Sequence, residues 1–459
     1  MKKITQCRVC GSKALTPAFS LPASISRPPR PGLIKPKKKN QTTDFVLCDP
    51  SRDALACGLL QSANFNPELS ACDQPSARYA TTRSNLRSLA TEALELISGR
   101  DCAALDIGCN DGTLLSFYPR WVDRYGVDPS PTIDKIGEWA WTAKTSFPAP
   151  ELDRALGGKK FDIISAASVL ELVDEPRAFF ARVKSLLAGD GVFTLETLYA
   201  PMALTRTHVE AFIGGASAVY SLAVLERILR DCGLKIFRGA LTDKDGGSIR
   251  LFITHDGVED HDFDPWFERL ARLWDEENAL ALRALQPYQA FEARALAARD
   301  ALRTMLTDLA DKGERAHLLG IGEQSAAVLA WAGEAACNDE RVISVAVADG
   351  ARATAPAVDL DVISETQSRA SEPDLLVAPA ALKREMLERW RESILLGARM
   401  IFVSPEPHIV YAQNYASVLA KALAAGDNAG GVETLRAILG AAGAPRLVAE
   451  NPGSKAASA

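Results

Sequence analysis

Residues 105–115 read Leu-Asp-Ile-Gly-Cys-Asn-Asp-Gly-Thr-Leu-Leu, a short apolar run followed by a turn with two glycines. A second run, Tyr125-Gly126-Val127-Asp128-Pro129-Ser130, ends in an acid and a proline. The pattern predicts a buried strand, a tight turn, the start of a helix and a second parallel strand. Such a unit forms a crevice at the carboxyl edge of the sheet, where nucleotides and nucleosides bind.

The residues that we expect to line this crevice are Asp106, Gly108, Asn110, Asp111, Gly112 and Asp128. Gly108 and Gly112 lack a Cβ, so the backbone can approach a ligand closely. The carboxylate of Asp128 can accept hydrogen bonds from both hydroxyls of a ribose.

Two cofactors fit such a crevice. A dinucleotide site requires G-x-G-x-x-G, whereas this turn is G-x-x-x-G and carries Asp106 and Asp111. Acids repel a pyrophosphate but tolerate the ammonium and sulfonium of S-adenosylmethionine (SAM). The sequence therefore favours SAM over a dinucleotide, with an ordinary strand-turn-helix that binds no ligand as the remaining alternative.

The composition is that of a globular protein, with 459 residues, 47% of them hydrophobic and 24% charged. This length predicts two to four domains. The net charge of -6 points to neither nucleic acid nor an anionic membrane as a partner. We find no signal peptide or transmembrane run, and the nine dispersed cysteines favour a reducing cytoplasm. The sequence does not indicate the oligomeric state.

The N-terminus contains a candidate zinc site. Cys7-Arg8-Val9-Cys10-Gly11 is a C-x2-C followed by glycine, which is typical of a zinc knuckle. Cys48 and Cys57 are the candidates for the second pair, although their spacing is wider than usual. Four thiolates around one zinc ion would form a closed structural site. The alternative is that these four cysteines hold no metal.

Strands and helices alternate after the glycine turn. Strands are predicted at 161–167 and 192–197, helices at 81–98, 178–187 and 222–232, and a final antiparallel pair at 234–237 and 248–254. This βαβ alternation with a closing hairpin is the layout of a class I methyltransferase. Residues 262–312 predict one or two connecting helices.

A second α/β unit follows, with strands predicted at 316–319, 342–347, 374–378 and 399–403. Its one G-x-G, at Gly320 to Gly322, leaves open whether it binds a nucleotide or only frames a cleft. The expected fold class is α/β, a Rossmann-like methyltransferase sheet between a small zinc domain and a C-terminal Rossmann-like domain. The predicted domains are 1–75 (zinc-binding), 76–258 (SAM-dependent methyltransferase), 259–312 (helical connector), 313–425 (C-terminal Rossmann-like) and 426–459 (C-terminal helix and disordered tail).

Several motifs, spread over roughly residues 5–410, match one known family. They are C-R-x-C-G at the N-terminus, C-G-L-x-Q after Cys57, I-G-x-N-D-G-T-L-L at 107–115, Gly-Val-Asp-Pro at 126–129, Glu196 with Tyr199, and Gly-Gly-Ser-Ile-Arg at 246–250. In these motifs and in domain order, the chain resembles the sugar-nucleotide C-methyltransferases. The resemblance implies a SAM cofactor, contacted also by Ser168 and Glu196, a structural zinc and a nucleotide-linked sugar as substrate.

The chain departs from this family at the catalytic residues. The family carries a Tyr-His-Glu-His cluster just before a Tyr-x-Ser-Leu helix start, and its histidine is the base. Here the same place reads Ile-Gly-Gly-Ala at 213–216, ahead of Tyr220-Ser221-Leu222. The histidine that precedes Gly-Gly-Ser is replaced by Asp245, and an asparagine by Ser168. In the C-terminal domain, the lysine of the family's glycine turn is missing at 322–327.

These losses leave two hypotheses. The first is an active methyltransferase for a nucleotide-linked sugar or similar polar metabolite, methylating carbon, nitrogen or oxygen. Carbon methylation needs a base, and His208, Glu210, Tyr199 and Tyr220 are the candidate replacements. The second hypothesis is a degenerate family member that binds SAM or a partner enzyme in a structural or regulatory role.

Overall fold

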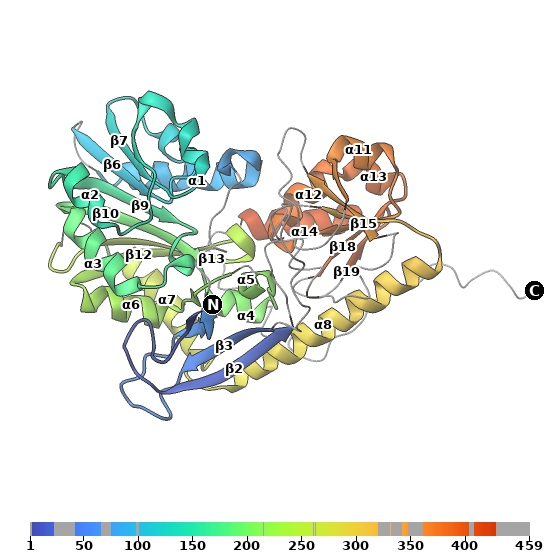
Figure 1. Cartoon of the computed structure of the whole chain (residues 1–459), viewed down its shortest axis with the longest axis horizontal. Helices are drawn as coiled ribbons and strands as arrows, with labels where there is room; N and C mark the ends of the chain where they lie inside the picture. The colour runs from blue at the N-terminus through green and yellow to red at the C-terminus, as the bar shows by residue number, and fades with distance from the viewer. Residues whose placement is uncertain are drawn as a thin grey trace, which may run out of the picture.

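The computed structural model describes residues 2–22, 42–65, 75–97, 101–213, 215–259, 261, 263–319, 331, 342–347, 361–403 and 408–427 (Figure 1). The described strands form a two-stranded, a four-stranded, a six-stranded and a seven-stranded sheet. The first two belong to the N-terminal unit, the seven-stranded sheet to the centre, and the six-stranded sheet to the C-terminal unit.

The N-terminal unit is built from short antiparallel strands. These are β1 (Lys2–Lys3), β2 (Leu15–Pro22), β3 (Thr42–Cys48), β4 (Leu60–Ser62) and β5 (Asn64–Phe65). The larger sheet has the order β11-β4-β3-β2, and its edge strand β11 (Ala218–Val219) comes from the central part of the chain. The N-terminal unit and the segment just before Tyr220 therefore share one sheet, which the sequence did not predict.

The central sheet has the order β12-β13-β10-β9-β6-β7-β8. Its strands are β6 (Cys102–Ile107), β7 (Val122–Val127), β8 (Trp141–Ala143), β9 (Phe161–Ala167), β10 (Leu187–Leu198), β12 (Leu234–Thr242) and β13 (Ser248–His255). Six strands run in the same direction, and β13 alone inserts antiparallel to them, between β10 and β12. This order is the class I methyltransferase topology and confirms the predicted fold class.

Helices and 3-10 turns follow most strands of this sheet. The helices are α1 (Ala80–Leu94), α2 (Pro150–Leu156), α3 (Pro176–Leu186), α4 (Ala200–Thr205), α5 (Glu210–Ile213) and α6 (Leu222–Asp231). The helix expected after the glycine turn is wrong, because only the 3-10 turn η3 (Leu115–Phe117) forms there. Pro119 disfavours helical backbone at the residue before it and provides no N–H, so the helix cannot continue. The last residue of the helix predicted at 81–98 lies outside the described residues, and α1 itself ends at Leu94.

Two helices connect the central sheet to the C-terminal unit, α7 (Asp264–Ala279) and α8 (Gln286–Asp311). Helix α8 runs from the N-terminal sheet to the C-terminal sheet (Figure 1). At one end Phe291 contacts the rings of Phe19 and Phe212, with centroids 4.9 and 4.8 Å apart. The same apolar cluster continues to Leu318 and Val377 of the C-terminal sheet. This helix is therefore a shared core element of the N-terminal and C-terminal sheets.

The C-terminal sheet has the order β16-β15-β14-β17-β18-β19, with only β19 antiparallel. Its strands are β14 (Ala316–Leu319), β15 (Val342–Val347), β16 (Asp361–Ser364), β17 (Leu375–Ala378), β18 (Arg399–Phe402) and β19 (His408–Val410). The helices are α11 (Glu365–Ala370), α12 (Lys383–Arg389), α13 (Arg391–Leu395) and α14 (Tyr415–Asp427). The four predicted strands are present, whereas β16 and β19 were not predicted. The 320–322 turn and the tail from 428 lie outside the described residues.

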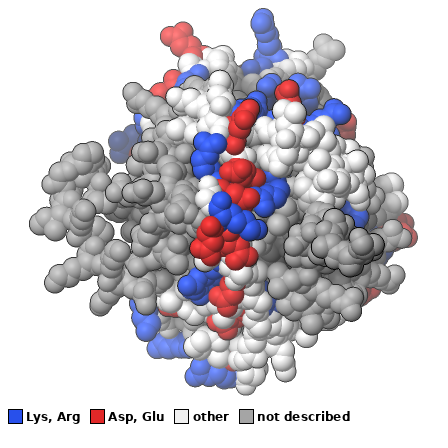
Figure 2. All heavy atoms as spheres, turned by 90° about the vertical axis from the view of Figure 1, so that its right-hand side faces the viewer, with Lys and Arg blue, Asp and Glu red and all other residues white. Residues whose placement is uncertain are grey.

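Charge on the C-terminal side of the molecule is mixed. Figure 2 shows basic and acidic side chains interspersed along this face rather than gathered by sign. Among the described residues, no helix combines the length and the apolar character that crossing a bilayer demands.

A buried ion pair ties α1 to the central sheet. Arg250 of β13 is 3% exposed, and its Nε donates to Glu196 Oε2 of β10 at 2.7 Å. Its other nitrogens donate to Ser88 and Asn85 and pair with Glu92, all on α1. The charge of Arg250 and that of Glu196 are shielded from water, and each has an opposite charge as its partner. A buried charge needs such a partner, because burial without one costs several kcal/mol.

We predict that Arg250→Met lowers the free energy of unfolding by about 3–5 kcal/mol, because Glu196 then remains buried without its cation. Urea unfolding followed by circular dichroism measures the change. The matched control is Arg272→Met, which removes an exposed partner of Glu268 and should cost less than about 1 kcal/mol. Equal losses in the two variants would contradict a structural role for the buried pair.

Candidate active site

The crevice at the carboxyl edge of the central sheet begins with Asp106. This residue is 3% exposed and accepts a hydrogen bond from Ser165 Oγ of β9 at 2.8 Å. Burial raises the pKa of Asp106 to about 7, although the Ser165 hydrogen bond favours the charged form. A cation bound beside Asp106 would draw the carboxyl into its charged form.

Asp128 follows the neighbouring strand β7 and faces the same turn. Its Oδ2 accepts from the backbone N–H of Asn110 at 2.9 Å, and its Oδ1 accepts from that of Ser130 at 2.7 Å. Each carboxylate oxygen keeps a further lone pair. Asp128 is therefore held in place by the backbone and can still accept hydrogen bonds from two hydroxyls.

The two glycines of the turn are required by their protein neighbours. Gly108 and Gly112 have φ of +75° and +76°. A Cβ at Gly108 would lie 2.4 Å from Val169 Cγ2, and one at Gly112 would lie 2.9 Å from Ile136 Cγ1. Both positions thus require glycine because of side chains packed against them, which is a different reason from the ligand approach expected from the sequence.

The side chains of Asn110 and Asp111 bind the segment that precedes α1. Ser76 N–H donates to Asn110 Oδ1 at 3.0 Å, and Ala77 N–H donates to Asp111 Oδ2 at 3.2 Å. The other oxygen of Asp111 accepts from the Thr113 hydroxyl at 2.6 Å. These two candidates shape the crevice through protein contacts.

Four non-glycine residues with left-handed backbone belong to the loops at this edge of the sheet. Asn110, Ser168, Thr207 and Asp245 have φ between 49° and 56°. They lie after β6, after β9, before His208 and in the turn before β13. Such conformations cost free energy and persist where the surroundings enforce them, often at functional sites. Their gathering at one edge points to this edge as the active site.

His208 is buried beside the turn that contains Asp245. It is 4% exposed, and a Cβ on Gly246 would lie 2.4 Å from its Cε1, so the ring lies against the glycine backbone. Within the described part of the chain, neither ring nitrogen has a hydrogen-bond partner, and Nε2 is 3.5 Å from Glu210 Oε2. Burial lowers the pKa of His208, opposed by Glu210 and Asp245. The structure thus brings His208 and Glu210 together.

Ser168 joins the same turn. Its hydroxyl donates to Asp245 Oδ2 at 2.6 Å, and Lys244 Nζ contacts both Ser168 Oγ and Asp245 Oδ2. The side chain of Lys244 is 9% exposed. The end of β9 and the β12–β13 hairpin are thereby joined by a largely buried cation, in the same turn that His208 packs against.

Three other candidates have structural partners or lie elsewhere. Tyr199 donates its hydroxyl to Glu277 Oε2 at 2.8 Å, and this carboxylate also accepts from the first two N–H groups of α6. Burial raises the pKa of Tyr199 well above its usual value. Tyr220 is fully buried near the cysteine cluster, and burial likewise raises its pKa. Glu196 uses one oxygen for Arg250 and the other for Asn85.

The described ends of the stretch that replaces the family's catalytic cluster are packed in the core. Ile213 and Ala216 are buried, and Ala218 of β11 pairs with Gln61 of β4. Ser217 N–H donates to the backbone oxygen of Glu171 at 2.6 Å. Where the family has polar residues, this chain therefore has an apolar connection between the central and N-terminal sheets.

Glu171 is a further titratable residue that the sequence analysis missed. It lies in the 3-10 turn η6 (Leu170–Leu172), is 5% exposed, and accepts from Thr197 Oγ1 at 2.8 Å. Burial raises its pKa to about 7. An acid inside the apolar run Val-Leu-Glu-Leu-Val at 169–173 was the signal that could have identified it.

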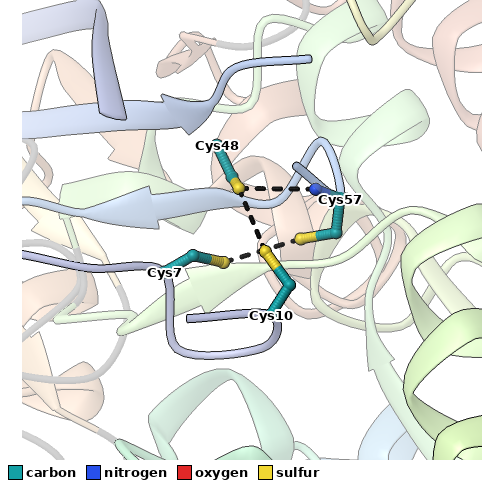
Figure 3. Close-up of side chains that lie close together, drawn as sticks. All are labelled: Cys7, Cys10, Cys48 and Cys57. Atoms are coloured by element: carbon teal, nitrogen blue, oxygen red, sulfur yellow. Dashed lines mark hydrogen bonds between the residues drawn. The ribbon is translucent and has the colours of Figure 1, made fainter. Parts of the chain in front are cut away.

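The four N-terminal cysteines converge on one point (Figure 3). All four sulfurs lie within 4.8 Å of one another, with Cys7 and Cys57 3.5 Å apart and Cys10 and Cys48 3.4 Å apart. Four ligands at about 2.3 Å from a tetrahedral zinc ion would lie about 3.8 Å apart. Three of the cysteines are buried, and Cys10 is half-buried. The geometry suits a metal ion held by four thiolates.

Two protein-family models match the chain. The model of a methyltransferase domain matches residues 79–238, and that of the C-methyltransferase C-terminal domain matches residues 243–405. Among curated proteins, the C-methyltransferase NovU of Streptomyces niveus is 24% identical over 239 residues, which cover 50% of this chain and 54% of that protein. The chain thus matches about half the length of this relative.

Solved structures of methyltransferases are similar to part of the chain. One is a SAM-dependent methyltransferase from Clostridium acetobutylicum, with 13% identity and a TM-score of 0.32, covering 38% of this chain and 92% of that one. Another is magnesium protoporphyrin IX methyltransferase from Synechocystis with bound SAM, with 18% identity and a TM-score of 0.29, covering 38% and 79%.

Proposed function

Because this chain belongs to the C-methyltransferase family, we propose that it transfers the methyl group of SAM to a nucleotide-linked sugar or a similar polar metabolite. The observation that carries the proposal is the crevice between β6 and β7. There a backbone-anchored carboxylate, Asp128, faces the turn, and a buried acid, Asp106, lies beside it. We propose that Asp128 binds the ribose of SAM and that Asp106 favours its positive charge.

The acceptor side of the site is the turn formed by Lys244 to Gly246 with His208 against it. We propose that His208 removes the proton from the acceptor. Its lowered pKa leaves the imidazole neutral near pH 7, so it can accept a proton. Glu210, 3.5 Å away, would stabilise the imidazolium that forms.

The C-terminal sheet supports a nucleotide-linked acceptor. From β14 the chain adds β15 and β16 on one side and then β17 and β18 on the other, so the order of the strands reverses between β14 and β17. In such sheets, ligands bind outside the carboxyl ends of the strands at this point. The 3-10 turn η8 (Ala380–Leu382), just after β17, contacts η7 (Lys244–Gly246) of the central domain. A nucleotide bound at the C-terminal sheet would therefore present its attached sugar to the turn beside His208.

A degenerate, non-catalytic role is the second candidate. It is favoured by the apolar stretch that replaces the family's catalytic cluster and by the structural partner of Tyr199. Such a protein would bind SAM without transferring its methyl group.

We also propose that the protein acts in the cytoplasm on a small molecule, without nucleic acid or membrane partners.

We propose that Cys7, Cys10, Cys48 and Cys57 hold a structural zinc ion. Their sulfurs fit a closed four-thiolate site. The ion would fix the turn around Arg8, whose Nε donates to Asp174 of the central domain at 3.0 Å. Zinc would therefore stabilise the contact between the N-terminal and central domains.

We predict that Asp128→Ala weakens binding of S-adenosylhomocysteine (SAH), the demethylated product of SAM, by about 10- to 100-fold. The reason is that two hydrogen bonds to a charged acceptor are lost. Isothermal titration calorimetry measures the dissociation constant. Asp134→Ala, which removes an exposed partner of Lys144, is the matched control and should bind like the wild type. A folded, metal-loaded wild-type protein that binds neither SAM nor SAH would overturn the proposed function.

His208→Ala should lower the rate of methyl transfer by about 100- to 10,000-fold, the usual contribution of a general base. The assay uses labelled SAM and a panel of nucleotide-linked keto-sugars. Burial lowers the pKa of His208 below the usual 6.5; Glu210 and Asp245 oppose this shift, and Arg206 adds to it. The wild-type rate should therefore fall only at acidic pH below 6.5, where the imidazole becomes protonated and can no longer accept a proton. His255→Ala, at the opposite edge of the sheet, should keep the wild-type rate. SAH binding without any methyl transfer would support the degenerate role.

Removal of the metal should destabilise the N-terminal unit. We expect one zinc ion per chain by atomic emission, and a lower thermal midpoint after chelation or in Cys48→Ser, because metal binding contributes directly to folding. Cys232→Ser changes a cysteine outside the cluster and should retain both the zinc ion and the midpoint. The assignment would be disproved if the purified wild-type protein contained no zinc, or if Cys48→Ser kept its full zinc content.

A further inference from the structure

Residues 75–81, which we name the bridging segment, connect the cofactor crevice with the C-terminal domain. Their first half lies on the crevice, where the N–H groups of Ser76 and Ala77 donate to the side chains of Asn110 and Asp111. Asn110 has a left-handed backbone, and its own N–H donates to Asp128. The bridging segment therefore contacts two residues that shape the crevice. One of them, Asn110, is hydrogen-bonded to Asp128, the residue that we propose to bind the ribose of SAM.

The second half of the bridging segment is anchored in the C-terminal domain. Tyr79 is 5% exposed and belongs to the same apolar cluster as Leu376, Met386 and Trp390. Burial raises the pKa of Tyr79 to about 12, which keeps its hydroxyl neutral. The side chain thus acts as an apolar anchor in the core of the neighbouring domain.

Glu385 of α12 provides the polar part of this anchor. Its Oε2 accepts from both the N–H and the hydroxyl of Thr81, at 3.2 and 2.7 Å. Its Oε1 accepts from Arg389 at 3.2 Å, and Arg389 also donates to Glu365 at 2.8 Å. Glu385 is 5% exposed, so its carboxylate is a fixed acceptor in a compensated ion-pair network.

We propose that Glu385 is a positioning residue for cofactor binding, although it belongs to the C-terminal domain. It holds Thr81, which fixes the N–H groups of Ser76 and Ala77 against the crevice. The N–H of Ser76 in turn holds Asn110 in its strained conformation, which needs support from its surroundings, and the N–H of Ala77 holds the neighbouring Asp111. This inference rests on the proposed function, since the ligand whose affinity it concerns is SAM.

The test compares SAH affinity in matched variants of the full chain by calorimetry. Thr81→Val and Glu385→Ala should each weaken SAH binding by about tenfold. Both changes remove hydrogen bonds between Thr81 and the Glu385 carboxylate, and only part of their free energy is expected to reach the crevice. The controls are Thr82→Val, the same change one residue along, and Glu388→Ala, which removes an exposed partner of Arg384 on the same helix. Both controls should bind SAH like the wild type.

A double-mutant cycle and hydrogen exchange separate positioning from general destabilisation. The double variant should bind SAH no more weakly than Glu385→Ala alone, because both changes break the same contact. Amide exchange should accelerate at residues 76–77 and 110–111 while the protection of β9 and β10 stays unchanged. Wild-type SAH affinity in both Thr81→Val and Glu385→Ala would overturn this inference and leave the proposed function intact. Loss of SAH binding in the wild type itself would overturn both.

Discussion

The guanidinium of Arg250 is the group around which the central domain is organised. Shielded from water, its N–H groups need acceptors, and these come from Glu196 on the neighbouring strand and from one face of α1. Helix α1 is thereby held in one orientation on the sheet. Its first residues then determine where the bridging segment lies, and through it the geometry of the cofactor crevice and the contact with α12.

The sequence predicted the sheets better than the site. Five of the seven residues at 161–167 are apolar, as expected for a strand buried on both faces, and the run forms β9. The prediction of a helix after the glycine turn was wrong because Pro119 allows only the 3-10 turn at 115–117. Tyr199 and Glu196 have partners 78 and 54 residues away, Glu277 and Arg250. No local pattern reveals contacts at such separations.

The left-handed residues show where local preference gives way to tertiary structure. Asparagine and aspartate adopt positive φ more readily than other non-glycine residues, so Asn110 and Asp245 are chemically suited to their positions. Ser168 and Thr207 are less suited, and their conformations need external support. The hydroxyl of Ser168 obtains it from Asp245 and Lys244. The loops of the site are therefore stabilised by one another.

A base for carbon methylation must be unprotonated before the reaction, and its protonated form must be stabilised once it takes the proton. Burial raises the pKa of Tyr199 and Tyr220, so their phenolate forms are disfavoured near pH 7. For His208 the same burial acts in the opposite direction, because its charged form is the protonated one. Burial thus keeps the imidazole neutral, while Glu210 and Asp245 stabilise the cation once it forms. We propose that burial, which disfavours the phenolates of the two tyrosines, is what makes a base of this histidine.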